Sequence, residues 1–220
     1  MMESNVFQRT TTQDAIISDV KYNLTIGAVL LWGFFVNWLL VVNVDPQFLR
    51  SINTFLFLLL YFGSAWYGIR MFTTSDDPVK SFIGYNFVVV PFGLVINMVV
   101  SQYSTEIVQE AIQVTGGVTA IMMILGAAYP AFFKRISGAL GVALIAVIII
   151  ELFQIFILGM HSNWLDWAVA AIFCGYIGYD WGRANQIPKT LDNAVDSAAA
   201  LYMDIINLFL RVLRIMGRRN

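Results

Sequence analysis

The chain has 220 residues, of which 59% are hydrophobic and only 12% charged, and its formal net charge at pH 7 is −1. So few polar side chains cannot cover the surface of a soluble domain, and the composition therefore predicts an integral membrane protein. The single cysteine excludes an internal disulfide, and we expect no cofactor and no nucleic-acid partner.

Residues 1–21 mix acids, bases, Thr and Gln, without an apolar core or a small-residue cleavage site. This pattern is not a signal peptide, and it predicts a cytoplasmic N-terminal tail. No linker downstream is long enough to separate domains, so residues 22–220 are predicted to form a single transmembrane domain of α-helices.

Long apolar runs follow the tail in sequence. A bilayer core about 30 Å thick needs roughly 20 apolar residues in a helix. Six runs of this kind occur at residues 24–44, 54–72, 82–100, 107–129, 138–158 and 164–182. Pro91 lies in the third run, where it should kink or break the helix. In the sixth run Ala171, Gly175, Gly178 and Gly182 form a small-residue stripe, which predicts the close approach of another helix.

A seventh segment, at about residues 195–216, is less apolar. Its polar stripe consists of Ser197, Ala200, Asp204, Asn207, Arg211 and Arg214, which recur at spacings of three and four. A stripe with these charges cannot face lipid, so it faces protein or water. The alternative is an amphipathic helix that lies in the membrane interface.

The distribution of Lys and Arg predicts the orientation. The tail and every second loop carry two basic residues each, namely Arg9, Lys21, Arg70, Lys80, Lys134, Arg135, Arg183 and Lys189, whereas the intervening loops hold only Arg50. By the positive-inside rule the N-terminus is cytoplasmic, and a multi-pass protein of the inner (plasma) membrane is expected. The seventh segment opposes this rule, because crossing would carry Arg214 to the outside.

Two acids, Asp180 and Asp204, lie 24 residues apart in the last two apolar segments. An ionisable group inside a membrane predicts a functional site. Asp180 could pair locally with Arg183. Alternatively, the two carboxyls meet, since consecutive antiparallel helices bring them to similar depth. Burial and the like charge would then oppose double ionisation, so the pair would share a proton and titrate as a unit near neutral pH.

The segment ALYMDIINLF at Ala200 to Phe209, followed by LRIMG, resembles the closing helix of the Bax inhibitor-1 family. Tyr179 and Asp180 match the YD element that ends the sixth helix of that family. The resemblance implies seven transmembrane helices, with the C-terminal helix packed centrally among the other six. It also implies a bacterial pH-sensitive calcium leak, with Asp180 and Asp204 as pH sensor, ion gate and transient Ca²⁺ ligands.

The resemblance further implies an arginine latch near the cytoplasmic end of the second helix. Arg70 is the positional match, although a lone Arg followed by MFTTSDDP departs from the family's basic cluster. Its alternative role is a positive-inside flank.

Glu151 also departs from the family pattern. It could hydrogen-bond a neighbouring helix or act as an upper stop for a cation. Asn86, Asn97 and Asn207 are further pore-lining candidates, although inter-helix hydrogen bonding is the commoner use of such residues. Asp45, Glu106, Glu110 and Asp166 would form an acidic outer mouth that concentrates cations.

These residues favour a cation leak channel, with Ca²⁺ as the ion that the resemblance supplies. A non-conducting regulator, which binds membrane proteases or stress-response proteins, is the alternative. An intramembrane aspartyl protease is less favoured, because the GxGD motif of those enzymes is replaced here by LYMD. We therefore expect no enzymatic activity, and we expect lipid, Ca²⁺ and a membrane protein as possible partners.

Overall fold

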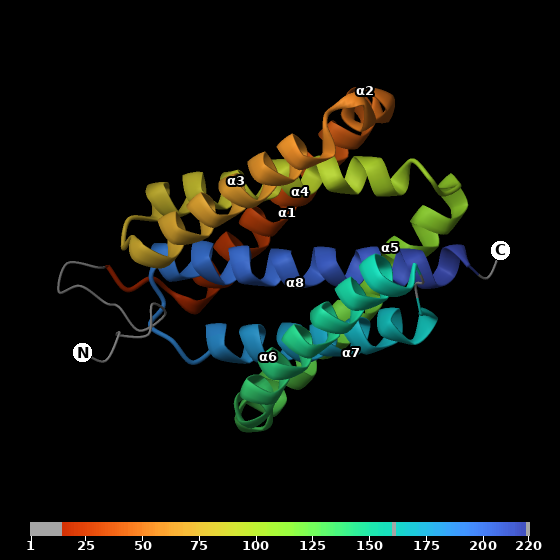
Figure 1. Cartoon of the computed structure of the whole chain (residues 1–220). Coiled ribbons are helices and arrows are strands. Elements are labelled where there is room, and N and C mark those ends of the chain that lie inside the picture. The colour runs from red at the N-terminus through yellow and green to blue at the C-terminus, as the bar shows by residue number, and fades with distance from the viewer. Residues whose placement is uncertain (1–14, 160–161, 219–220) are drawn as a thin grey trace. The chain divides into compact units, whose positions relative to one another are not determined.

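The computed structural model describes residues 15–159 and 162–218, and within them the fold is all-helical (Figure 1). Most of the predicted tail, residues 1–14, lies outside the described residues. The elements are α1 (Asp19–Asn43), α2 (Pro46–Ser51), α3 (Thr54–Thr74), α4 (Pro78–Val100), α5 (Thr105–Ala128), α6 (Pro130–Phe153), the π-helix η2 (Gln154–Leu158), α7 (Asn163–Ala184) and α8 (Leu191–Gly217). Each predicted run therefore corresponds to a helix.

Capping residues fix where several helices begin. The backbone N–H of Gln47 donates to the carboxylate of Asp45 at 2.8 Å, and the N–H of Val79 donates to that of Asp77 at 2.9 Å. Each cap precedes a proline in the first helical turn, where the missing N–H costs nothing. The turn at Pro46 thus starts the short helix α2, which was not predicted. Pro130 likewise starts α6 earlier than the predicted residue 138.

The helices α4 and α6 each contain a place where a regular α-helix could be interrupted. The helix α4 runs on through Pro91, so the expectation of a break there is wrong. At its carboxyl end α6 widens into η2, which stops at Gly159 with φ 61. Glycine suits this left-handed conformation because it has no Cβ.

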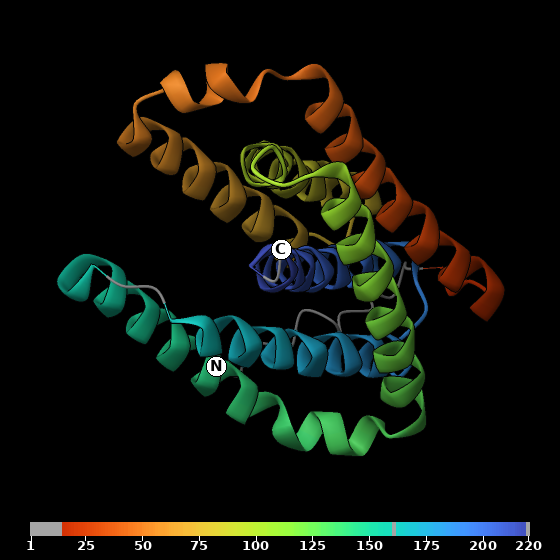
Figure 2. The same cartoon turned by 90° about the vertical axis from the view of Figure 1, so that its right-hand side faces the viewer.

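The described residues divide into two compact units. The first contains α1 to α4 and α8 as far as Tyr202, and Figure 2 shows α2 joining α1 to α3 within it. Here α4 packs against both α1 and α3. The backbones of α3 and α4 come so close that a Cβ on Gly84 would lie 2.7 Å from the carbonyl oxygen of Gly68.

The second unit contains α5, α6, η2, α7 and α8 from Met203. In it α7 packs against α5 and α6. A Cβ on Gly182 would lie 2.8 Å from the carbonyl oxygen of Gly126 on α5, and one on Gly175 would lie 2.8 Å from the Leu140 side chain on α6. The close approach predicted from the small-residue stripe is confirmed, and the neighbours are α5 and α6.

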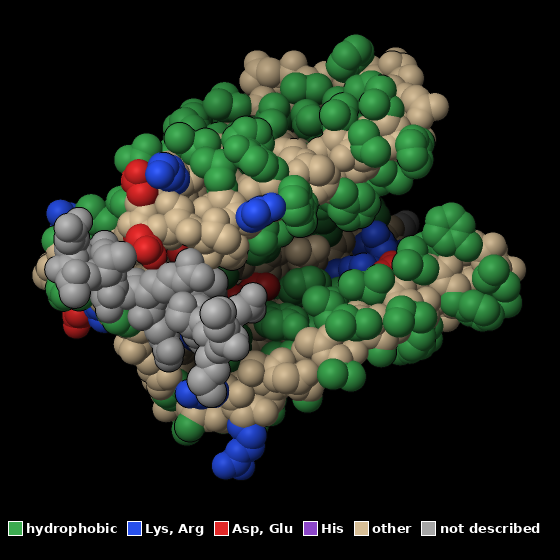
Figure 3. All heavy atoms as spheres, turned by 60° about the vertical axis from the view of Figure 1, so that its left-hand side comes forward, with side chains coloured by type: hydrophobic (Ala, Val, Ile, Leu, Met, Phe, Trp, Pro, Cys, Tyr) green, Lys and Arg blue, Asp and Glu red, His purple; other side chains and the backbone are tan. Residues whose placement is uncertain are grey.

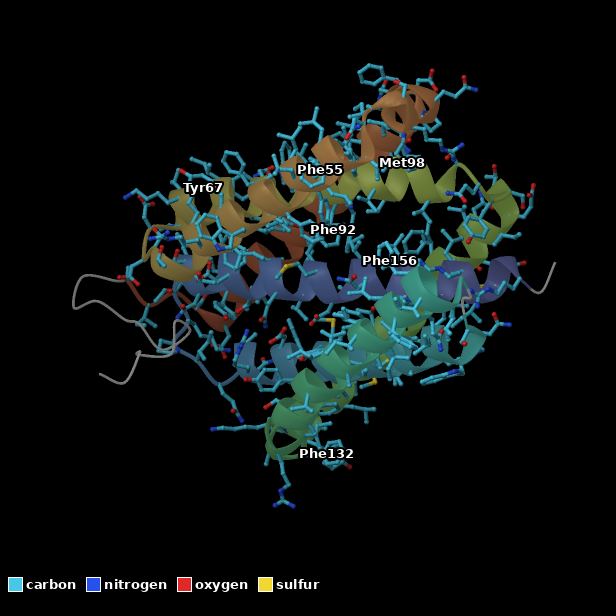
Figure 4. All side chains as sticks on the ribbon, viewed as in Figure 1. Phe55, Tyr67, Phe92, Met98, Phe132 and Phe156 are labelled. Carbon is cyan, nitrogen blue, oxygen red and sulfur yellow. The ribbon has the colours of Figure 1, made fainter. Side chains whose placement is uncertain are left out.

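Five helices in the described residues are long and apolar enough to cross a membrane, namely α1, α3, α4, α5 and α6 continued by η2. Hydrophobic side chains cover much of the face shown in Figure 3. Among the exposed aromatic residues labelled in Figure 4 are Phe55, Phe132 and Phe156, at 76%, 57% and 78% exposure. Such exposure suits a lipid environment. The helices α7 and α8 carry the charged residues described next.

Candidate functional site

The polar stripe of α8 contacts protein in both units. In the first unit the hydroxyls of Ser197 and Tyr22 are 3.1 Å apart. In the second unit Arg211 pairs with acids from other helices. The prediction that this stripe faces protein or water is consistent with these contacts. The amphipathic pattern alone could not identify these partners.

Asp180 on α7 and Asp204 on α8 are brought together by the antiparallel return of the chain. The two side chains lie close enough to interact with each other, and the two residues are only 8% and 7% exposed. The predicted approach of the two acids is therefore present in the structure. The shared proton stays a prediction.

Arg183 lies on the same helix as Asp180 and places a positive charge beside the carboxyl pair. Its guanidinium lies 2.9 Å from the Asp180 carboxylate, one helical turn away, and 5.3 Å from the centre of the Tyr179 ring. The local ion pair and the carboxyl pair were weighed as alternatives from the sequence. The structure contains both, because Asp180 presents one side to its own helix and the other to α8.

A second group of charges forms an ion cluster within the second unit. It consists of Glu151 on α6, Asp166 on α7, and Arg211, Arg214 and Arg218 of the closing segment. Arg211 binds Glu151 through two parallel contacts of 2.8 Å, and it also lies 2.9 Å from Asp166. Arg214 reaches both acids, at 3.3 Å and 3.1 Å, and Arg218 lies 2.7 Å from Asp166. Three α-helical segments are thus joined by ion pairs.

Asp166 corrects the sequence interpretation. It was expected in an acidic mouth exposed to solvent, yet its side chain is fully buried against arginines. A signal for this did exist: Asp166 precedes Asp180 by fourteen residues, and Arg218 follows Asp204 by fourteen. Fourteen residues are about four helical turns, so both positions recur on one face. In an antiparallel pair of helices, a contact at Asp180 and Asp204 then predicts one at Asp166 and Arg218.

Glu151 bonds a neighbouring helix, which is one of the two roles that the sequence left open. Its partners include Arg211 and Arg214 of α8. The other role, a stop for a passing cation, stays a prediction.

The three asparagines proposed to line a pore make hydrogen bonds within or between helices. The Asn97 amide donates to the carbonyls of Leu40 and Val44, both at 2.9 Å. Asn86 accepts from the Trp32 indole at 2.9 Å. Asn207 donates to Met203 of its own helix at 2.7 Å. Asn86 and Asn97 therefore have the inter-helix role, and lining a pore stays a prediction for all three.

Arg70, the latch candidate, lies in the first unit near the end of α3. Its guanidinium sits 5.6 Å from the centre of the Trp66 ring, an arrangement typical of a cation–π interaction. Its backbone carbonyl accepts from the Thr74 hydroxyl at 2.6 Å. The latch role stays a prediction.

The described residues contain no group of three or more His, Cys, Asp or Glu side chains suited to hold a metal ion. Ca²⁺ takes six to eight oxygen ligands in tightly bound sites. Asp180 and Asp204 alone supply far fewer, and their role as transient Ca²⁺ ligands stays a prediction.

The family model described as inhibitor of apoptosis-promoting Bax1 matches residues 17–220. Bax inhibitor 1 of Schizosaccharomyces pombe is 28% identical over 80% of this chain and 64% of its own length. The inner membrane protein YbhL of Escherichia coli is 27% identical over 58% of each chain, and an uncharacterised protein of Helicobacter pylori is 26% identical over 70% of this chain and 67% of its own.

The chain thus spans a little under two thirds of the length of the yeast relative. The match of the family model covers almost all of the residues described above, including both carboxyls of the pair and the ion cluster. This protein belongs to the Bax inhibitor-1 family of membrane proteins.

Proposed function

We propose that this protein is a pH-sensitive cation leak channel, with Ca²⁺ as the main ion, and that Asp180 and Asp204 act as its pH sensor and gate. The observation that carries the proposal is the pair of interacting carboxyls buried between α7 and α8. A buried acid pair is costly to maintain, and within a membrane protein such groups mark ion or proton pathways.

The physical basis is the change of charge at this contact. While a proton is shared, the pair carries at most one negative charge, which Arg183 can offset. Loss of the proton leaves two like charges in contact, and these repel one another unless a cation lies between them. The pair thus couples proton binding to cation binding and to the packing of α7 against α8.

The architecture proposed with this function has seven transmembrane helices. The five apolar helices would be joined by α7 and α8, with α8 enclosed by the others and its charges kept from lipid. The Lys and Arg distribution supports a cytoplasmic N-terminus in the inner (plasma) membrane. Arg70 is the proposed latch that holds the closed state. No catalytic role is proposed for either aspartate.

Calcium flux into liposomes tests the proposal. Purified protein is reconstituted in vesicles that contain a Ca²⁺-sensitive dye, and the leak rate is measured on both sides of neutral pH. We expect a pH-dependent leak in the wild type, and loss of this dependence in Asp180→Asn and Asp204→Asn. The control is Asp19→Asn, which removes an exposed acid of α1. A pH response that survives in both aspartate variants would contradict the proposal.

A second candidate is a non-conducting regulator that binds membrane proteases or stress-response proteins. The family's own description as an inhibitor favours it. It predicts that a membrane protein co-purifies in fixed proportion and that the reconstituted protein does not pass Ca²⁺. Absence of any leak from folded protein, together with such a partner, would favour this candidate over the channel.

A further inference from the structure

The ion cluster of Glu151, Asp166, Arg211, Arg214 and Arg218 is not used by the carboxyl-pair mechanism. Its five side chains carry three positive and two negative charges, an excess of one positive charge. The Asp166 side chain is fully buried and those of Glu151 and Arg211 are 14% and 18% exposed, whereas those of Arg214 and Arg218 are 33% and 30% exposed. Screening by water and salt is therefore weaker around Asp166, Glu151 and Arg211 than around Arg214 and Arg218.

The cluster lies on the same stripe of α8 as the gate. Arg211 follows Asp204 by seven residues, which is two turns or about 10 Å along the helix. Asn207 occupies the turn between them. A cation that leaves the Asp180 and Asp204 pair along this stripe therefore meets guanidinium groups next.

The charge of these groups is permanent. A guanidinium does not lose its proton in proteins, so the cluster keeps its positive excess while the carboxyl pair titrates. The two parallel contacts between Arg211 and Glu151 also fix the position of the charge, since this bidentate geometry is directional. The fixed positive charges of the cluster thus lie beside a carboxyl pair whose charge changes with pH.

We propose that this ion cluster is a charge barrier that sets the rate and charge selectivity of the leak, independently of the pH-sensing pair. The inference rests on the proposed channel function. Arg211 raises the barrier for cations and Glu151 lowers it, so the two residues act in opposite directions although they bind each other. A purely structural role, in which the cluster ties α6, α7 and α8 together, predicts instead that loss of either partner acts in the same direction.

The test measures Ca²⁺ leak in dye-loaded liposomes at one pH. Arg211→Gln removes the excess positive charge, and we expect a leak on the order of three- to tenfold faster. Glu151→Gln doubles the excess, and we expect a leak slower by a similar factor. The double variant restores the original excess and should return to near the wild-type rate. Arg135→Gln, which removes an exposed arginine of α6, is the control and should leave the rate unchanged.

Folding is checked for every variant by size-exclusion chromatography and thermal melting in detergent. Arg211→Lys keeps the charge and loses the bidentate contact, so its leak rate should stay near the wild type even where its melting temperature falls. The barrier is overturned if Arg211→Gln and Glu151→Gln shift the leak in the same direction, if neither shifts it, or if Arg211→Lys behaves like Arg211→Gln. A folded wild type without any leak would overturn the channel function and the barrier together.

Discussion

The guanidinium of Arg183 lies 2.9 Å from the carboxylate of Asp180, which also interacts with Asp204. A fixed positive charge thus lies beside the acid pair. A nearby positive charge favours the ionised form of a carboxylate. Arg183 supplies that charge next to Asp180.

Replacement of Arg183 should therefore shift the pH response of the proposed leak. In Arg183→Gln the cation that stabilises the ionised form is gone, so the proton is held to higher pH. We expect the midpoint of the pH dependence to rise. The measurement is the liposome leak assay over a pH series.

Arg183→Lys is the matched variant, because it keeps the positive charge. Its midpoint should stay closer to that of the wild type. A midpoint that falls in Arg183→Gln would contradict this electrostatic role.

The contact of α5 with α7 at Gly126 should not tolerate a methyl group. A Cβ on Gly126 would collide with the backbone of Gly178. Backbone atoms cannot relieve such a clash by changing rotamer, as a side chain can. We expect Gly126→Ala to destabilise the protein by about 1–3 kcal/mol, as overpacking does. Thermal melting in detergent measures the loss.

Gly117 on the same helix provides the control, since a Cβ there meets nothing within 4 Å. Gly117→Ala should be neutral, or stabilising by up to about 1 kcal/mol through helix propensity. Equal melting temperatures for the two alanine variants would contradict the close helix approach.

Tyr202 and Asn37 should be coupled in stability. The Asn37 amide donates to the Tyr202 hydroxyl at 2.8 Å, and that hydroxyl lies 3.0 Å from the Asn37 side-chain oxygen. Tyr202→Phe leaves a buried amide without its partner, at a cost of about 1–3 kcal/mol. We expect the double variant with Asn37→Leu to lose less than the sum of the single losses, by thermal melting. Strict additivity would show that the pair does not interact.

Asn97 should hold the carboxyl end of α1. Its amide donates to carbonyls at the last turn, which have few helical partners of their own. Asn97→Ala should cost about 1–3 kcal/mol and speed hydrogen exchange at the junction of α1 and α2. Asn86→Ala is the comparison. Its partner Trp32 is partly exposed, so the loss of this hydrogen bond should cost less stability. Unchanged exchange at that junction in Asn97→Ala would argue against the role.

The long helices could be predicted from the sequence because length and apolar content suffice for them. The residues of α2 could not, since six residues with Arg50 among them resemble an ordinary loop. The start of α6 was also missed. Lys134 and Arg135 suggested a solvated loop, whereas Pro130 is the residue that begins the helix.

The carboxyl pair could be predicted from the sequence, because a short connection forces α7 and α8 to run antiparallel. The ion cluster was not predicted as a unit. Arg211 and Arg214 were placed on the correct stripe, but Asp166 was assigned to an acidic outer mouth because it lies in the first turn of α7, at a helix end. Only the register between the two helices identifies its partners.

The dependence of Glu151 and Asp166 on Arg211 also has a consequence for biosynthesis. The ribosome completes α6 and α7 before it reaches the arginines, so both acids are synthesised before the arginines that they pair with. These ion pairs therefore form only after the final stretch of polypeptide has been made. A chain truncated ahead of Arg211 would lack all three arginines of the ion cluster.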